Sequence, residues 1–175
     1  MRLFIAINFE DALKNSLCET IERLKGDAVK GSFTHRDNLH LTLVFLGEVA
    51  VDKVSLVKAA MNKTNCSPFE LKLSGIGRFK HDGGDILWVG VDISESLLSI
   101  YNQLSTELTK SGFSIERREY KPHLTLGREV VLKDSINIGE AEVSDMHMTA
   151  DKISLMKSER IGGLLRYTEI YAKQL

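Results

Sequence analysis

Two identical tetrapeptides stand in this chain, His40-Leu41-Thr42-Leu43 and His123-Leu124-Thr125-Leu126. In an extended strand, successive side chains point to opposite faces, so each histidine shares a face with the threonine two residues later. The leucines then point to the other face. Each copy is therefore predicted to be a β-strand with one apolar face and one face that carries an imidazole and a hydroxyl. Two such strands in one groove would supply the groups needed for proton transfer at a phosphate.

The two tetrapeptides belong to a weak internal repeat. Residues 3–8 (LFIAIN) align with residues 87–92 (LWVGVD), at nearly the spacing that separates the histidines. Each unit then reads as a strand, a helix, a loop of about a dozen residues and the tetrapeptide strand. The helices, expected over 13–24 and 97–108, carry apolar residues at every third or fourth position, and Asp92 with Glu95 is expected to cap the second.

Beyond the tetrapeptides the two halves differ. Residues 51–64 have the apolar spacing of a helix, whereas residues 134–140 are polar and predict a loop. Further strands are expected over 69–77, 142–149, 153–158 and 167–173, with a turn at Gly162-Gly163 before the last. The pattern predicts an α+β fold of two pseudo-symmetric lobes, each an antiparallel sheet with helices on the outside, in one bilobal domain over residues 1–175. The central groove would carry both motifs.

Composition limits the classes of function. The formal net charge is -1 and 27% of the residues are charged, which argues against a protein that holds nucleic acid by bulk positive charge. Two cysteines are too few for a disulfide framework and lack the spacing of metal ligands. The first ten residues resemble neither a signal peptide nor a membrane span. We therefore expect a cytoplasmic protein without membrane association, and infer no obligate protein partner.

The residue types predict metal-independent chemistry. Hydrolysis of a phosphodiester needs a base for the attacking water, an acid for the departing oxygen and donors for the phosphoryl oxygens. His40 and His123 could serve as the acid and base because imidazole titrates near neutral pH. Thr42 and Thr125 would hold the phosphate. The symmetry of the two motifs leaves open which histidine is the acid, and no cofactor is expected.

The chain resembles the 2H phosphoesterase superfamily, and within it the LigT-like RNA 2′,3′-cyclic phosphodiesterases. The resemblance rests on the paired motif, on VFLGE at 44–48, YKP at 120–122 and LMKSE at 155–159, and on the Gly127-Arg128 pair. It implies opening of an RNA-terminal 2′,3′-cyclic phosphate to a 2′-phosphomonoester. It also implies that His40 is the proton donor and His123 the proton acceptor. The partners expected are RNA ends or nucleotides with a 2′,3′-cyclic phosphate.

Other candidate contacts rest on position alone. Arg128, three residues after Thr125, would steady the phosphate charge, although a solvated surface arginine is an equal reading. Phe45 would lie on the core side of a regular strand, and could contact a nucleobase only if the strand end bends. Arg36 and Lys121, together with the Arg117-Arg118 pair, precede the motifs and could form a basic rim for RNA.

Three alternatives stay open. The chain could be a 2′,5′ RNA ligase or a phosphodiesterase for another cyclic or 2′,5′-linked nucleotide. It could also be an RNA- or nucleotide-binding module without activity, although both histidines and both threonines are present. A metal site at His40 and His123 is disfavoured because the carboxylate or cysteine ligands expected close in sequence are absent.

Overall fold

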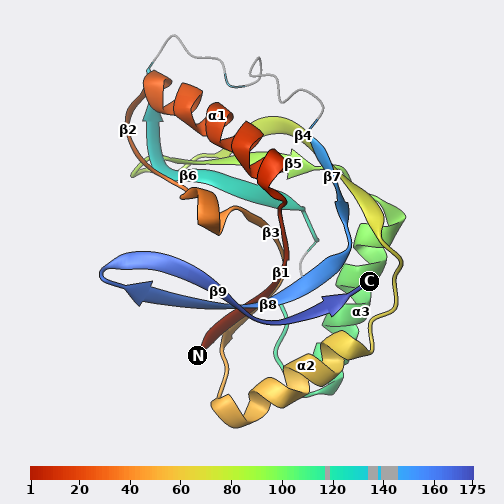
Figure 1. Cartoon of the computed structure of the whole chain (residues 1–175). Coiled ribbons are helices and arrows are strands. Elements are labelled where there is room, and N and C mark those ends of the chain that lie inside the picture. Colours follow the sequence, from red (N-terminus) through yellow and green to blue (C-terminus); the bar gives the residue numbers. More distant parts are fainter. Residues whose placement is uncertain (117–118, 134–137, 139–145) are drawn as a thin grey trace.

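A computed structural model of the chain describes residues 1–116, 119–133, 138 and 146–175. Two antiparallel sheets form the framework (Figure 1). The first sheet has the order β3-β1-β8-β9, with β1 Arg2–Asn8, β3 His40–Glu48, β8 Lys152–Ile161 and β9 Leu164–Gln174. The second has the order β2-β6-β5-β4-β7, with β2 Ala28–Phe33, β4 Phe69–Phe79, β5 Asp85–Val91, β6 His123–Leu132 and β7 His147–Ala150. The predicted fold class is confirmed.

Within the described residues, three α-helices lie on the outside of the sheets (Figure 1). They are α1 (Asp11–Asp27), α2 (Val54–Asn62) and α3 (Glu95–Lys110), with 3-10 turns at Arg36–Asn38 and Val51–Lys53. Helix α1 contacts β2 and β6, whereas α3 contacts α2 and β3. All three were predicted from their apolar spacing. The cap of α3 was not: the Ser94 hydroxyl, rather than Asp92, accepts the Leu97 N–H at 3.2 Å.

The two halves of the repeat exchange strands and helices. Strand β4 follows the first motif along the chain, yet it pairs with β5 of the second sheet. Strand β8 follows the second motif and pairs with β1 of the first sheet. Helix α1, from the first half, covers the second sheet, and α3, from the second half, packs against the first. One apolar cluster, which includes the leucines of both tetrapeptides, runs through both sheets.

One strand was missed in the sequence. Residues 28–33, predicted as part of a loop, form β2 and pair with β6. None of the six residues is fully buried, so the segment lacks the alternation of apolar and polar residues that marks a strand. Backbone hydrogen bonds to β6 stabilise it instead. Of the strand expected at 142–149, residues 147–149 belong to β7, while 142–145 and most of the predicted loop at 134–140 lie outside the described residues.

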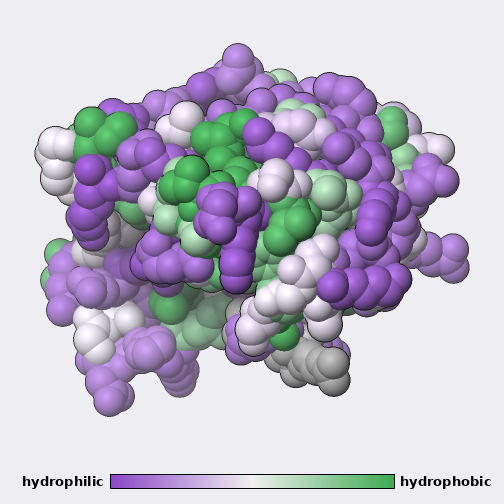
Figure 2. All heavy atoms as spheres, turned by 90° about the horizontal axis from the view of Figure 1, so that it is seen from below, coloured by the Kyte–Doolittle hydropathy of each residue, from purple (hydrophilic) through white to green (hydrophobic). Residues whose placement is uncertain are grey.

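The surface agrees with the large share of charged residues in the sequence, 27%. Seen from below, the molecule is hydrophilic over most of its area, with apolar patches between the polar side chains (Figure 2). Within the described ranges, no helix is both long enough and apolar enough to cross a membrane.

Candidate active site

Both motif strands contain a β-bulge directly after the motif threonine. In β3, Thr42 lies opposite Ala6 while Val44 lies opposite Ile5, so Leu43 is the additional residue. In β6, Thr125 lies opposite Trp88 and Gly127 opposite Leu87, so Leu126 is additional. A bulge places two residues against one and reverses the alternation beyond it.

The bulge in β3 decides where Phe45 lies. Beyond it, Val44 is buried and Phe45 is 51% exposed, on the side of the strand that carries His40. The Phe45 ring stacks on Phe4, with centroids 6.3 Å apart and an angle of 11°, and the Arg2 guanidinium lies over it at 5.2 Å. The preference for core packing at Phe45 is therefore wrong, because the strand is not regular at this point.

Arg128 occupies the equivalent position in the second motif, five residues after its histidine. Its side chain is exposed, and its positive charge acts on Tyr167 of β9, a strand of the other sheet. Burial raises the pKa of the Tyr167 hydroxyl, and the nearby positive charges of Arg128 and Arg2 oppose that shift. Since the Tyr167 ring lies edge-on to His40, at 5.1 Å between centroids, Arg128 and His40 face the same region from different sheets.

His40 is held on three sides. Its Nδ1 lies 2.7 Å from the Asn38 carbonyl oxygen, and its Nε2 lies 3.0 Å from the Thr42 hydroxyl. The Phe4 ring packs against the imidazole at 4.9 Å. A backbone carbonyl can only accept a hydrogen bond, so Nδ1 carries a proton and Nε2 is the nitrogen that gains or loses one.

His123 has the same backbone anchor and different neighbours. Its Nδ1 lies 2.8 Å from the Lys121 carbonyl oxygen, again two residues before the histidine. The Phe79 ring stands edge-on to the imidazole at 5.5 Å, and Trp88 lies at 6.2 Å. The anchor again holds a proton on Nδ1 and leaves Nε2 without a backbone partner in the described hydrogen bonds. Two equivalent anchors therefore fix both imidazoles in one tautomer.

The electrostatics of His40 favour its neutral form in the free protein. Burial lowers the pKa of the imidazole because a charged ring loses hydration. The Asn38 carbonyl opposes this shift by accepting the Nδ1 proton, and the positive charge of Lys14 lowers the pKa further.

Reciprocal hydrogen bonds connect the two motifs. The Tyr120 hydroxyl, from the segment before β6, donates to the Thr42 carbonyl oxygen of β3 at 3.1 Å. The Thr34 hydroxyl, from the segment before β3, donates to the Thr125 carbonyl oxygen of β6 at 2.7 Å. Burial raises the pKa of the Tyr120 phenol, so this group stays protonated and remains a donor. Each motif is thus fixed by the approach segment of the other.

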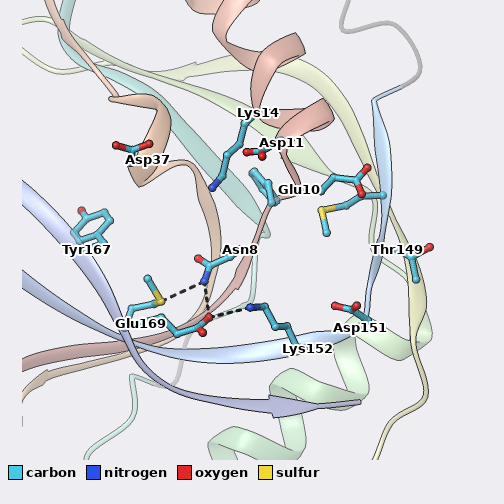
Figure 3. A pocket seen from close by; sticks show the side chains of 13 residues that line it. Asn8, Glu10, Asp11, Lys14, Asp37, Thr149, Asp151, Lys152, Tyr167 and Glu169 are labelled. Atoms are coloured by element: carbon cyan, nitrogen blue, oxygen red, sulfur yellow. Dashed lines mark hydrogen bonds and ion pairs between the residues drawn. The ribbon is translucent and has the colours of Figure 1, made fainter.

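A pocket of about 540 Å³ opens beside the His40 side of the site (Figure 3). Tyr167 belongs both to its wall and to the aromatic neighbours of His40. The Lys14 ammonium points into the pocket, toward Asn8. On its floor, the Glu169 carboxylate accepts hydrogen bonds from Ser154 at 2.6 Å and from Asn8 and Lys152, each at 3.2 Å. This side of the site therefore has room for more than a phosphate.

The residues predicted for the basic rim are already paired. Arg36 forms an ion pair with Asp11 of α1 at 2.8 Å, and Lys121 lies 3.3 Å from the Glu119 carboxylate. As RNA contacts they stay predictions, and Arg117-Arg118 lies outside the described residues. In the part of the chain that the structure describes, no cluster of three or more His, Cys, Asp or Glu side chains could hold a metal ion.

Several neighbours of the histidines were missed in the sequence. Phe4 and Trp88 occupy equivalent positions of the aligned strands at 3–8 and 87–92, so the repeat contained a signal for both. Tyr167 and Phe79 reach the histidines through strand pairing, whereas Tyr120 precedes β6 and reaches the first motif through its hydroxyl. Lys14 lies on α1, which crosses to the other lobe.

Comparison with known proteins gives one consistent group of relatives. Residues 13–162 match the profile of the 2′-5′ RNA ligase superfamily. A protein of Archaeoglobus fulgidus named RNA 2′,3′-cyclic phosphodiesterase is 31% identical over 160 residues, which is 85% of this chain and 89% of the relative. A protein of the same name from Thermotoga maritima is 35% identical over 131 residues, covering 73% and 70% of the two chains. The crystal structure of E. coli LigT complexed with 3′-AMP has a TM-score of 0.86 at 26% identity, covering 99% of this chain and 97% of the other.

Proposed function

Since the chain belongs to the 2′-5′ RNA ligase superfamily, we propose that it opens RNA-terminal 2′,3′-cyclic phosphates to 2′-phosphomonoesters by paired-histidine acid-base catalysis without a metal ion. The matching relatives in Archaeoglobus fulgidus and Thermotoga maritima carry the name of this activity. The observation that carries the mechanism is the shared anchor of the two imidazoles. Each Nδ1 faces a backbone carbonyl two residues earlier, which leaves each Nε2 for proton transfer.

The reaction balances with these two groups alone. His123 Nε2 takes a proton from water as the water oxygen forms its bond to phosphorus. The bond from phosphorus to the 3′ oxygen breaks, and that oxygen takes the proton from His40 Nε2. The product keeps its phosphate on the 2′ oxygen, and proton exchange with solvent restores both histidines. The direction of this assignment follows the family resemblance.

Thr42, Thr125 and Arg128 would hold the phosphate during this step. In the free protein the Thr42 hydroxyl lies 3.0 Å from His40 Nε2. A bound phosphate would draw this hydroxyl to a non-bridging oxygen and leave Nε2 for the leaving group. Arg128 is exposed and adds a guanidinium that can neutralise the developing charge.

The lowered pKa of His40 in the free protein is compatible with its role as acid. A cyclic phosphate brings a negative charge next to the imidazole, and an opposite charge close by favours the protonated form. Binding of the anionic substrate therefore raises the pKa of His40 and offsets the effect of burial. The substrate also displaces water from the site, and the attraction between the phosphate and the imidazolium becomes stronger when solvent is excluded.

The terminal nucleoside would lie on the His40 side. In an in-line displacement the leaving oxygen is opposite the attacking water, so the ribose is next to the acid. The pocket beside His40, with Tyr167 on its wall and Lys14 pointing into it, provides the space. Phe45 is exposed enough to stack on a base, and Arg36 and Lys121 would contact the RNA backbone at the rim.

The decisive experiment is product analysis with RNA that ends in a 2′,3′-cyclic phosphate, in the presence of a chelator. The proposal requires a 2′-phosphomonoester as product and turnover that survives metal removal. A 3′-phosphate would contradict the assignment of the broken bond, and activity that returns only with added metal would contradict the mechanism. Binding without turnover would favour the alternative of a nucleotide-binding module.

A further inference from the structure

The groove face of the second sheet carries a tryptophan that lies flat across two strands. Trp88 of β5 is opposite Gly77 of β4, and a methyl group added at Gly77 would overlap the six-membered ring of the indole. A methyl group at Gly90 would overlap the Ser74 hydroxyl at 2.5 Å and would only touch the ring, at 3.5 Å. The indole therefore occupies the space that a side chain at position 77 would fill, with one ring face against the sheet.

Phe79 and His123 border this ring. The Phe79 centroid is 5.3 Å from that of Trp88, at an angle of 33°, and Phe79 is 42% exposed. His123 stands edge-on to Phe79 at 86°. The Trp88 Nε1 atom is buried and finds no acceptor among the described residues. The position of the indole is thus explained by its flat face and not by a hydrogen bond. Phe79 and Trp88 together are called the β4–β5 platform.

The equivalent place in the first sheet is covered. Phe4, which aligns with Trp88 in the repeat, is 2% exposed and packs against Tyr167 and Phe45. Trp88 is partly exposed, and its aromatic neighbour Phe79 extends into solvent. The two histidines therefore have different surroundings: a filled aromatic cluster beside His40 and an open platform beside His123.

We propose that the β4–β5 platform is a stacking site for the base of a second nucleoside, one that presents a free 5′-hydroxyl to the phosphorus. This inference rests on the proposed function, in which water enters from the His123 side. Hydrolysis needs only a proton acceptor on that side. A flat aromatic surface next to the acceptor fits a nucleobase, since every base has a face that stacks on an aromatic ring.

The corresponding step needs no further reactant. His123 Nε2 takes the proton of the 5′-hydroxyl while its oxygen bonds to phosphorus. The bond to the 3′ oxygen breaks, and this oxygen takes a proton from His40. The product is a 2′,5′-phosphodiester with a free 3′-hydroxyl, and the ring opening of the cyclic phosphate drives its formation. Because the step is reversible, the same site would hold the departing nucleoside when a 2′,5′ linkage is cleaved.

Trp88 is the only tryptophan of the chain, so its fluorescence reports the platform directly. Adenosine, which has a 5′-hydroxyl and no phosphate, is titrated into the protein with 2′-AMP already bound. We expect saturable quenching by adenosine, and roughly tenfold weaker binding in Phe79→Ala, a loss typical for one stacking aromatic. A matched change outside the site, Leu56→Ala on the exposed face of α2, should leave the affinity for adenosine unaltered.

Three results would overturn the inference: no quenching by adenosine, quenching by adenosine that Phe79→Ala does not weaken, or saturation of the signal by 2′-AMP alone. The last would assign the platform to the terminal nucleoside. A second measurement follows the ratio of 2′,5′-linked product to hydrolysis product with a 5′-hydroxyl oligonucleotide present. Phe79→Ala should lower this ratio. Failure of the proposed function is separate, because it abolishes turnover by the wild type without altering the fluorescence titration.

Discussion

The two histidines differ in what surrounds them and agree in how they are anchored. His40 lies in a cluster of Phe4 and Tyr167, with its Nε2 at the Thr42 hydroxyl. His123 lies beside the open β4–β5 platform. Both imidazoles have Nδ1 at the carbonyl oxygen of the residue two positions earlier. The motif therefore sets the tautomer, and the neighbouring strands set the environment.

This difference gives a physical basis for unequal roles. Burial lowers the pKa of His40, so its charge in the working site depends on a bound anion. The residues at the fifth position after each histidine add to the asymmetry, because Phe45 offers an apolar surface and Arg128 a positive charge. A duplicated motif has thus become one site with two distinct sides.

The largest expected effect is the loss of activity on removal of either histidine, and a second substrate shows which histidine is the acid. His40→Ala and His123→Ala should each reduce kcat/KM for a cyclic phosphate by about 100-fold or more, the lower range for general acid-base catalysis. With a 4-nitrophenyl phosphodiester, whose leaving group needs no proton, His40→Ala should lose much less activity than His123→Ala. The steady-state rates of both variants on both substrates decide the matter. The opposite order would exchange the two roles.

The next largest effect is the salt dependence expected if the basic rim contacts the RNA backbone. If Arg36 and Lys121 each neutralise one phosphate, kcat/KM for an oligonucleotide should fall roughly sevenfold more than for a mononucleotide between 50 and 200 mM salt, given a slope of about 0.7 per contact. Lys121→Gln should halve the additional slope. Equal salt dependence for the two substrates would remove the rim from the site.

A smaller effect is expected at the connection between the motifs. Tyr120→Phe removes the hydroxyl that donates to the Thr42 carbonyl oxygen and should cost about 1 kcal/mol of unfolding free energy. For a chain of this size that corresponds to a Tm lower by about 2–4 °C. We also expect a loss in kcat larger than the change in KM.

The control for this change is Tyr101→Phe. The Tyr101 ring stacks on Tyr120 at 4.1 Å, so its variant keeps the ring contact and removes a hydroxyl that does not reach Thr42. Equal effects of the two variants on kcat would contradict a positioning role for Tyr120.

The smallest effect tests the electrostatics of His40. Lys14→Gln should raise the pKa of His40, because the lysine charge disfavours the imidazolium. If His40 is the acid, a larger protonated fraction at neutral pH should increase kcat/KM, and lowering the pH toward that pKa should do the same in the wild type. A decrease in kcat at saturating substrate in Lys14→Gln would favour His40 as the base, whereas a rise in KM alone would report the loss of the ammonium from the pocket. NMR titration of the imidazole at low salt measures the shift, with Lys25→Gln at the far end of α1 as the control.

Much of the fold could be predicted because the repeat and the apolar spacing are local signals. The strands that carry the motifs, all three helices and the β8–β9 hairpin were located from periodicity and glycine turns. Strand β2 was not, since its stability comes from pairing with β6 and not from an alternating pattern of its own. The cap at Ser94 was missed because Asp92 offered a competing capping residue.

For the site, the sequence identified the histidines, the threonines and Arg128 as candidates through duplication and family resemblance. It could not place Phe45, whose orientation depends on the register shift opposite Ile5 and Ala6. The aromatic neighbours also depend on register: Phe79 and Tyr167 meet the histidines through strands far away in the chain. Such contacts follow from strand pairing, which a single sequence does not specify.

The exchange of β4 and β8 between the sheets bears on how such a protein arose. A half-chain with one motif would lack the strand that the other half contributes to its sheet: β8 beside β1, or β4 beside β5. A second copy of the half-chain could supply that strand. The symmetric pair would have held one catalytic groove between two subunits, with a histidine from each. Fusion of two such copies through the β4–β5 turn would preserve the groove and free its two sides to diverge, which a homodimer cannot do.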